Sequence, residues 1–509
     1  MNLQSRSPLQ SSRIINSSVD GQPKTLFLAI DFGSQSVRAL LIDCDGCIVE
    51  KQQLTNLQYI KTSPKYVEQQ ADWFYRQVTI VCQNLLKKAQ ADNIDLRSIT
   101  AIGITTMRNT LINLDQHGEP LRNAIVWSDT RTAKSLPKLA WYWRAIFTIA
   151  SIVKPITSTI KELQSKAFIN YIAEQEPKVW QQTQHLLLLS GYLSFRLTGK
   201  LVDSSANVIS HLPFNFKQGK WRNRFSWQYQ ALAVKPNWLP TLVKPATVIG
   251  NLTDNTAKDL GLASTLPLVA TAADKSCEIL GSGCYLAGQL HISLGTAVSV
   301  NMLSAKYKGP KPLYPAYPSL VDGIYLTEKM LNHGMILLNE FIKVNAAGLG
   351  FLSLNKPDTI SIEHLIELYI IANNIHCDDV VFNLNTLDRA EQVMSGFSGE
   401  HIGNVFSQYL AIIDAIVLQI AHAIKELNRR LHTIPSQVIV SGGGANSTLI
   451  LKKIANITKL PVIKPSTDEA GALGVAITIA VATNVYPNWS EAINAMCSNT
   501  NTIAPDVLS

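Results

Sequence analysis

Three Gly-rich turns, each placed after an apolar run, carry the residues best suited to bind a phosphate chain. The runs are LFLAIDFGSQSVRALLID at Leu26–Asp43, HISLGTAVSV at His291–Val300 and QVIVSGGGANSTL at Gln437–Leu449. Each favours a buried strand that breaks into Gly with Ser, Thr or Asn. Such turns present backbone N–H groups and hydroxyls to phosphate oxygens. One turn alone reads equally well as an ordinary β-turn, but three across the chain predict two domains closing on one nucleotide.

Two aspartates follow apolar runs, where a carboxylate could reach a reacting group. Asp31 ends the first run and could hold a metal ion through water. Asp274 follows LVATAA at 268–273 and could accept a hydroxyl proton at hydrogen-bond distance. A helix N-cap is the alternative for Asp274, because Cys277 and Glu278 follow it.

The elements that must position these residues alternate between strands and helices, which indicates mixed sheets with helices on their faces. Expected strands are paired segments within Leu26–Gln53 around a turn at Asp45-Gly46, then Ile99–Thr105, Leu266–Ala273, His291–Met302 and Ile324–Met330. Expected helices are Trp73–Ala91, Val405–His432, Asn446–Lys459 and a buried one at Ala470–Thr483.

Length and composition narrow the function classes. With 509 residues, 46% of them hydrophobic and 16% charged, the chain predicts a globular protein of two or three domains. The net charge of +8 comes from dispersed basic residues, so we expect no nucleic-acid partner. Seven scattered cysteines form no metal-ligand pattern and fit a reducing compartment, so we expect a cytoplasmic protein.

Two segments raise the question of targeting or membranes. Residues 1–24 are polar and Ser-rich, which predicts a disordered extension, with an organelle transit peptide as the alternative. Leu139–Thr157 is rich in aromatics beside Arg144 and Lys154. We interpret it as a packed helix or a subunit interface of a possible homodimer, with a membrane-surface helix as the alternative. No apolar run reaches the length that spans a bilayer, so we expect no stable membrane insertion.

The order of the three Gly-rich turns resembles the ATPase core shared by sugar kinases, actin and heat-shock chaperone ATPases. Further motifs resemble the FGGY carbohydrate kinases, and among them a subgroup of unassigned substrate. These motifs are VEQQADWFYRQV at Val67–Val78, ITAIGITTMRNTLINLDQHGEPLRNAIVWSDTR at Ile99–Arg131, LLLLSGYLSFRLTGKLVDSSANV at Leu186–Val208, ATAADKSCEILGSG at Ala270–Gly283 and DEAGALGVAITIAVA at Asp468–Ala482.

The resemblance implies an α/β fold of two actin-like, ribonuclease-H-like ATPase domains with an interdomain cleft. Residues 25–283 would form the N-terminal domain, with the sugar site and the catalytic base. Residues 284–509 would form the C-terminal domain, which binds the nucleotide. The implied activity is transfer of the γ-phosphoryl group from ATP, with Mg²⁺, to a hydroxyl of a small sugar or polyol.

The resemblance also assigns roles to residues. Asp274 aligns with the catalytic base, and Asp31 with the metal site. Arg108, Asn109 and Lys275 would contact the substrate together with Asp274, although a surface Arg at a strand end is the alternative for Arg108. Residues implied in ATP binding are Ser34, Gln35, Ser36, Arg38, Gly295, Thr296, Gly334, Gly443, Gly444, Ala445 and Asn446.

Two regions depart from the family pattern. Gly323–Asn339 keeps Glu328 and Gly334 but lacks a Trp and one Gly, and Val380–Gly399 lacks the usual Pro-rich loop. These changes favour an alternative function, a catalytically weakened relative that binds nucleotide or sugar as a sensor or partner protein. A chaperone-like or actin-like ATPase is a third possibility, against which the Arg108 segment and the Asp274 strand argue.

Overall fold

The first domain is built on a mixed six-stranded sheet. The computed structural model describes residues 24–506, except 56, 64, 152–155, 332, 354–359, 378–379, 388, 399–403 and 498–499. The strand order is β14-β15-β6-β1-β2-β3. The strands are β1 Leu26–Phe32, β2 Ser36–Asp43, β3 Ile48–Thr55, β6 Ile99–Thr106, β14 Val248–Asn251 and β15 Pro267–Val269. The disordered extension predicted at 1–24 lies outside the described residues, apart from Lys24, which pairs with Asp43 and Asp45.

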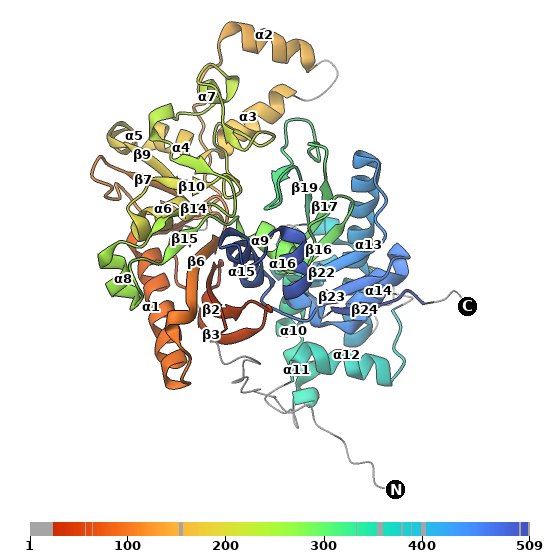
Figure 1. Ribbon diagram of the computed structural model, residues 1–509. Helices are drawn as coiled ribbons and strands as arrows, with labels where there is room; N and C mark the ends of the chain where they lie inside the picture. The colour runs from red at the N-terminus through yellow and green to blue at the C-terminus, as the bar shows by residue number, and fades with distance from the viewer. Residues whose placement is uncertain are drawn as a thin grey trace.

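The second sheet has seven strands in the order β18-β19-β17-β16-β22-β23-β24. The strands are β16 Leu290–Leu294, β17 Val298–Ser304, β18 Tyr317–Pro318, β19 Tyr325–Leu331, β22 Val438–Ser441, β23 Val462–Pro465 and β24 Thr500–Ile503. In each sheet a central strand, β1 or β16, runs antiparallel to the next strand in sequence and parallel to a later one on its other side. The two domains therefore repeat one topology, and Figure 1 shows the two sheets side by side.

Helices cover both faces of the first sheet. Helix α1, Ala71–Ala91, packs on one face through a regularly spaced apolar stripe that includes Phe74 and Val78. The other face is covered by α15, Ala470–Ala482, which comes from near the end of the chain. In Figure 1, α15 lies in the middle of the molecule, beside β6 and β2. The domain boundary between 283 and 284 stays a prediction. Helix α15 comes from the C-terminal side of that boundary but packs on the sheet of the first domain.

Helix α15 also crosses α9, Asp274–Gly281, at very short range. A Cβ on Gly474 would lie 2.0 Å from the carbonyl oxygen of Cys277, and one on Gly281 would lie 1.9 Å from that of Ala470. Each helix therefore needs Gly at its crossing point, where the backbones touch directly. Because α9 starts at Asp274, this crossing fixes the helix that carries the predicted base.

The second sheet is covered mainly by α13, Val405–Leu431, and α14, Thr448–Thr458. The first and last residues predicted for these helices and for α15 are confirmed to within two positions. Strand β15 is shorter than predicted: it ends at Val269 because Ala270 bonds to the Ala246 and Thr247 backbone, leaving the sheet ladder.

Residues 60–69 and 111–243 form a separate layer above the first sheet, with a five-stranded sheet of order β4-β5-β8-β7-β9. Its strands and neighbours are β4 Ile60–Ser63, β5 Tyr66–Gln69, β7 Leu111–Leu114, β8 Ala124–Ile125, β9 His185–Leu188, β10 Val202–Ser204, β11 Phe214–Asn215, β12 Lys220–Trp221 and β13 Thr241–Val243. Its helices are α2 Trp141–Ala150, α3 Ile156–Lys166, α4 Phe168–Gln175, α5 Pro177–Gln182, α6 Leu189–Thr198 and α7 Trp227–Ala231.

Seven further α-helices and strands complete the two domains. They are α8 Asp254–Leu260, α10 Ile336–Val344, α11 Ala346–Leu349, α12 Ile362–Ala372, α16 Trp489–Met496, β20 Val381–Phe382 and β21 Phe397–Ser398.

Helix α2 contradicts the interpretation of 139–157 as a packed helix. It projects from the first domain at the top of Figure 1, and Phe147 is its one buried side chain, against Trp227. Trp141 is 74% exposed and Ile149 is 68% exposed. The apolar composition predicted packing, but no described element covers this face. Among all described residues, no helix combines the length and apolar character that crossing a membrane requires.

Candidate active site at the junction of the two sheets

Three parallel strands of the first sheet bring the predicted catalytic residues to one edge. Strand β1 pairs with β6 in a register that puts Asp31 opposite Thr105, and β15 pairs with β6 on its other side. Because the carboxyl ends of parallel strands meet at one edge of a sheet, Asp31, Arg108 and Asp274 leave the sheet on the same side. Burial is the main cause that raises the pKa of Asp31, and the negative charge of Asp274 adds to the rise.

Asp274 is the first residue of α9, and Ala273 is its N-cap. The N-cap alternative for Asp274 is therefore wrong. One carboxylate oxygen accepts the backbone N–H of Lys275 at 2.8 Å, and the Nε atom of Arg108 lies 3.7 Å from the same oxygen. Burial raises the pKa of Asp274, although Arg108 and then Lys275 oppose the rise. A carboxylate with a raised pKa accepts a proton more readily than an ordinary aspartate.

Arg108 and Asn109 follow β6, but they face different partners. Arg108 forms a two-pronged ion pair with Glu328 on β19, with distances of 2.9 and 3.1 Å. The guanidinium carbon lies 5.7 Å from the centroid of the Tyr317 ring. Asn109 has a φ of 55°, and its side-chain oxygen accepts the hydroxyl of Ser210 at 2.6 Å. Arg108 thus reaches the second domain, whereas Asn109 stays within the first.

A buried polar network joins α9 to the second sheet. Lys275 donates to Glu278 at 2.6 Å and to the hydroxyl of Ser293 at 2.7 Å. Glu278 also accepts the hydroxyls of Ser293 at 2.7 Å and Ser441 at 2.6 Å. Ser293 and Ser441 are directly opposite each other on β16 and β22. Both strands lead into predicted nucleotide turns, so Glu278 links those turns to the helix that begins with Asp274.

The charges in this network reinforce one another. The pKa of Glu278 falls to about 2: burial opposes the fall, but Lys275 and His291 outweigh it. The pKa of Lys275 is raised, because Glu278 and Asp274 outweigh its burial. Burial lowers the pKa of His291 to about 4, and its Nε2 atom contacts the Ser441 hydroxyl at 2.9 Å. At neutral pH the network therefore holds a carboxylate, an ammonium group and a neutral imidazole. Lys275 is engaged in this network, and its contact with a substrate stays a prediction.

Asp31 is a partly buried carboxylate, with 15% of its side chain exposed, and no cation of the described residues lies within hydrogen-bond distance of it. Arg38 Nη1 lies 3.6 Å away, and the same atom also donates to Glu469 at 3.3 Å. Burial raises the pKa of Asp31 to about 7, against the effect of Arg38 and with that of Asp274 and Glu469. A cation bound here would stabilise the ionised form of Asp31 and so offset the free-energy cost of burying its charge.

The donor set around Asp31 fits magnesium. Within the described ranges there is no group of three or more His, Cys, Asp or Glu side chains arranged to hold a metal. Mg²⁺ is ordinarily bound by one or two carboxylates, waters and phosphate oxygens rather than by a protein cage. Asp31, at an edge where phosphate-binding turns are predicted, would hold the ion, and the metal would supply charge neutralisation on the phosphates.

The first Gly-rich turn joins β1 to β2. It is closed by a bond from the Gly33 N–H to the Ser36 carbonyl at 3.0 Å. The Ser34 hydroxyl accepts the indole N–H of Trp127 at 2.8 Å, Gln35 is exposed and Ser36 is buried. The turn therefore offers the Gln35 side chain and backbone groups to a ligand, while Trp127 engages the Ser34 hydroxyl.

The other two turns lie side by side at the end of the second sheet, after β16 and β22. Thr296 is exposed, and a Cβ on Gly334 would lie 2.8 Å from its carbonyl oxygen. Gly442 has a φ of 87°, and Gly443 has open space around it. A Cβ on Gly444 would lie 2.6 Å from the sulfur of Met335. Ala445 is buried, and the side-chain oxygen of Asn446 accepts a hydrogen bond from the ammonium group of Lys464. Open space at Gly443 and exposure at Thr296 leave these turns accessible to a ligand.

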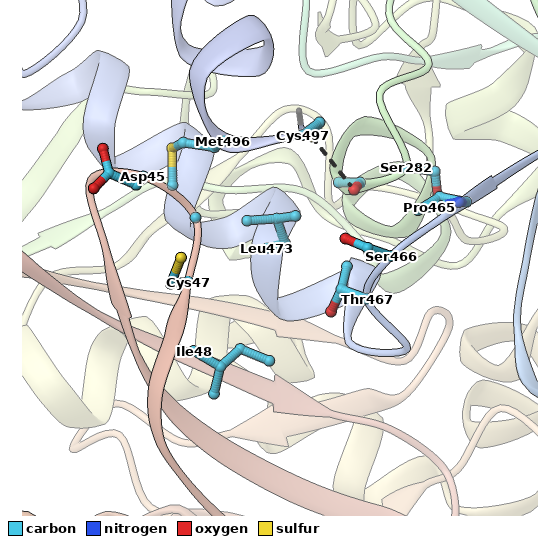
Figure 2. Close-up of a pocket in the computed structure, with 12 residues that line it drawn as sticks. Asp45, Cys47, Ile48, Ser282, Pro465, Ser466, Thr467, Leu473, Met496 and Cys497 are labelled. Atoms are coloured by element: carbon cyan, nitrogen blue, oxygen red, sulfur yellow. Dashed lines mark hydrogen bonds between the residues drawn. The ribbon is translucent and has the colours of Figure 1, made fainter. Parts of the chain in front are cut away.

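A pocket of about 230 Å³ lies at the other end of α9. Figure 2 shows its lining from the β2–β3 turn, the end of α9, the loop after β23, α15 and the end of α16. Asp45 and Cys47 line it from the turn, and Cys497 lies on its far side. Asp274 and Gly281 are separated by seven helical residues, or roughly 10 Å. The pocket is thus distinct from the predicted catalytic edge.

Two family models match the sequence in succession. The N-terminal domain of the FGGY family of carbohydrate kinases matches residues 26–281, and the C-terminal domain of that family matches residues 290–483. The chain belongs to the FGGY family of carbohydrate kinases. The predicted family and the two-domain actin-like fold are confirmed.

Similar proteins within the FGGY family carry different substrate names. The chain is 24% identical over 483 residues to a xylulose kinase of Staphylococcus epidermidis, covering 93% of this chain and 91% of the relative. A gluconate kinase structure from Lactobacillus acidophilus has a TM-score of 0.76 and 20% identity, covering 95% of this chain and 94% of that one. A Plasmodium falciparum glycerol kinase structure with ADP has a TM-score of 0.73 and 16% identity, with coverage of 95% and 94%. At these identities the structures show the shared fold.

Sequence reasoning missed three members of this FGGY site: Glu278, Ser293 and Ser441. A signal was present, because Ser441 directly precedes a Gly-rich turn, Ser293 lies two residues before Gly295, and Glu278 lies one helical turn after Asp274. Glu328 was noted as a retained residue, but its pairing with Arg108 across the domains was not predicted.

Proposed function

We propose that this FGGY protein is an ATP- and Mg²⁺-dependent kinase that phosphorylates a hydroxyl of a small sugar or polyol. The observation that carries the proposal is the network through Glu278. It ties the helix that begins with Asp274 to the strands that lead into both nucleotide turns. A base and a nucleotide held on one rigid framework are what phosphoryl transfer requires, because its catalysis is mostly positioning and electrostatic stabilisation.

In the proposed reaction the proton of the acceptor hydroxyl passes to a carboxylate oxygen of Asp274. The acceptor oxygen bonds to the γ-phosphorus, and the bond from that phosphorus to the β–γ bridging oxygen breaks to release ADP. The raised pKa of Asp274 supports its role as proton acceptor. Arg108 and Asn109 would orient the acceptor, and Asp31 would hold the metal. The three Gly-rich turns, together with Arg38 and Gly334, would bind ATP.

The names of the similar proteins support a small polyhydroxy compound as the phosphoryl acceptor. Xylulose, gluconate and glycerol are all small polyhydroxy compounds. The bound ADP of the glycerol kinase supports a nucleotide in the corresponding fold. A cytoplasmic location and a homodimer remain predictions from the sequence.

Coupled ADP release across pentuloses, hexuloses, pentitols, aldonates and glycerol tests the proposal, with Asp274→Asn as the matched blank. We expect one acceptor to stimulate ADP release strongly, and Asp274→Asn to lose turnover by about 10³-fold while retaining nucleotide affinity by calorimetry. Near-normal turnover in Asp274→Asn would remove it as the base. ATP binding with no acceptor-dependent turnover would favour the sensor function instead.

A further inference from the structure

The position of the Arg108 guanidinium is decided by the second domain. Both of its terminal nitrogens are held by Glu328, at 2.9 and 3.1 Å, whereas its Nε atom remains 3.7 Å from Asp274. The first two distances are direct charge-assisted hydrogen bonds, and the third is longer than a direct bond. Arg108 thus lies between two carboxylates and is bonded to the one that the other domain supplies.

Glu328 is a rigid anchor for this pair. It lies in the middle of β19, opposite Asn301 of β17, and the neighbouring Thr327 donates its hydroxyl to the Lys308 carbonyl at 2.8 Å. Its side chain is 9% exposed and that of Arg108 is 16% exposed. Charges this buried require a partner, and a two-pronged Arg–carboxylate pair fixes direction as well as distance.

We propose that Glu328 is a positioning residue for the phosphoryl transfer proposed above, on which this inference rests. By binding both terminal nitrogens of Arg108, it keeps the guanidinium off Asp274. The base is then free for the acceptor hydroxyl only while the second domain is docked. Without Glu328, the nearest remaining carboxylate for Arg108 is Asp274, and a direct ion pair would occupy the oxygens that must accept the proton.

Of the titratable groups around Asp274, Arg108 is the one whose position depends on Glu328. The groups that face it are Arg108 after β6, Lys275, Glu278 and Cys277 on α9, and Asp31 at the end of β1. Lys275 already donates to Glu278 and Ser293, and this pairing does not involve Glu328. The cation whose distance from Asp274 depends on Glu328 is therefore Arg108.

Glu328→Gln tests the proposal, since it keeps the side-chain shape and removes the charge. The matched control is Asp322→Asn, which removes another ion pair between the domains, Lys244–Asp322 at 2.7 Å, whose side chains are 72% and 73% exposed. We expect Glu328→Gln to lower kcat at least about tenfold, and the acid limb of its pH profile to move about one unit lower. Asp322→Asn should change neither. The acid limb moves down because a closer Arg108 lowers the pKa of Asp274.

Glu328→Asp is the second variant, in case Glu328→Gln does not fold. It retains the charge on a shorter arm, so we expect a smaller shift of the acid limb in the same direction. A merely structural role for Glu328 would lower the urea midpoint and leave the acid limb in place. An unchanged or upward-shifted acid limb in a folded variant overturns the proposal.

A denaturation cycle separates this inference from the proposed function. If no acceptor supports turnover in the wild type, the kinase proposal fails, and the cycle decides the positioning claim by itself. Arg108→Ala, Asp274→Asn and the double variant are made in the wild type and again in the Glu328→Gln background, and the urea midpoint of each is measured. The coupling between Arg108 and Asp274 must be larger when Glu328 is replaced. Equal coupling in both backgrounds overturns the inference.

Discussion

Replacing Gly474 by Ala should separate two helices that need to touch. The new Cβ would lie 2.0 Å from the carbonyl oxygen of Cys277, so α15 and α9 must move apart by about 1 Å to bring that distance to 3.0 Å. Helix α15 has little room to retreat, because a Cβ at Gly103 on β6 would already meet Val475 at 2.7 Å. We therefore expect α9 to move, and Asp274 to move with it.

The expected cost follows from that displacement. Overpacking of this kind destabilises by about 1–3 kcal/mol, and the better helix propensity of Ala returns up to about 1 kcal/mol. A catalytic group misplaced by about 1 Å loses about 10²-fold in rate. Gly474→Ala should thus lower stability by about 1–2 kcal/mol and lower kcat far more than that loss of folded protein explains.

The assay pairs urea denaturation with coupled ADP release on the same preparations. Gly348→Ala on α11 is the matched control, because its Cβ would meet no atom within 4 Å. It should be neutral or slightly stabilising, with kcat unchanged. If Gly474→Ala behaves like Gly348→Ala in both measurements, the helices do not need direct backbone contact and the reasoning is refuted.

Two other predictions concern charge. Asp31→Asn should stabilise the ligand-free protein at pH 8 by up to about 4 kcal/mol, because the raised pKa of about 7 makes the folded state less stable as pH rises from 3.8 to 7. Thermal unfolding with and without Mg²⁺ and ADP should show that the variant has lost the metal-dependent increase in Tm. A variant that is less stable than the wild type at pH 8 would contradict the role of burial. Because the pKa of Glu278 is lowered, its carboxylate should contribute about 3 kcal/mol to the free energy of unfolding, fully present above pH 4.5 and lost as pH falls toward 2. In urea titrations the difference in stability between the wild type and Glu278→Gln should therefore narrow from pH 4.5 to 2. A constant difference would contradict this assignment.

Local patterns in the sequence predicted most of the secondary structure. The turn at Asp45-Gly46 between β2 and β3, the amphipathic stripe of α1 and the fully apolar α15 follow from nearest neighbours along the chain. The strands that end at Asp31 and the Gly-rich turns were found in the same way, because a buried apolar run that breaks into Gly is a local signal.

Contacts between residues that are far apart in the sequence could not be predicted from local patterns. Arg108 and Glu328 are 220 residues apart, and Glu278 and Ser441 are 163 apart. Each is a polar residue of a type that is ordinarily exposed, so its burial depends on how two separate sheets are docked. The exposure of α2 was missed for the same reason, because apolar composition predicts a covered face but the covering element must come from elsewhere in the fold.

The position of α15 has a consequence for synthesis of the protein on the ribosome. Phe27 and Leu40, on one apolar face of the first sheet, are synthesised early, but the helix that covers them is more than 400 residues further along. At about 5–20 residues per second, that face waits roughly 20–90 s for its cover. A nascent chain in this state exposes an aggregation-prone surface, so its yield in cells should depend on chaperones that bind unfinished first domains. A chain truncated before Ala470 would keep that face open permanently.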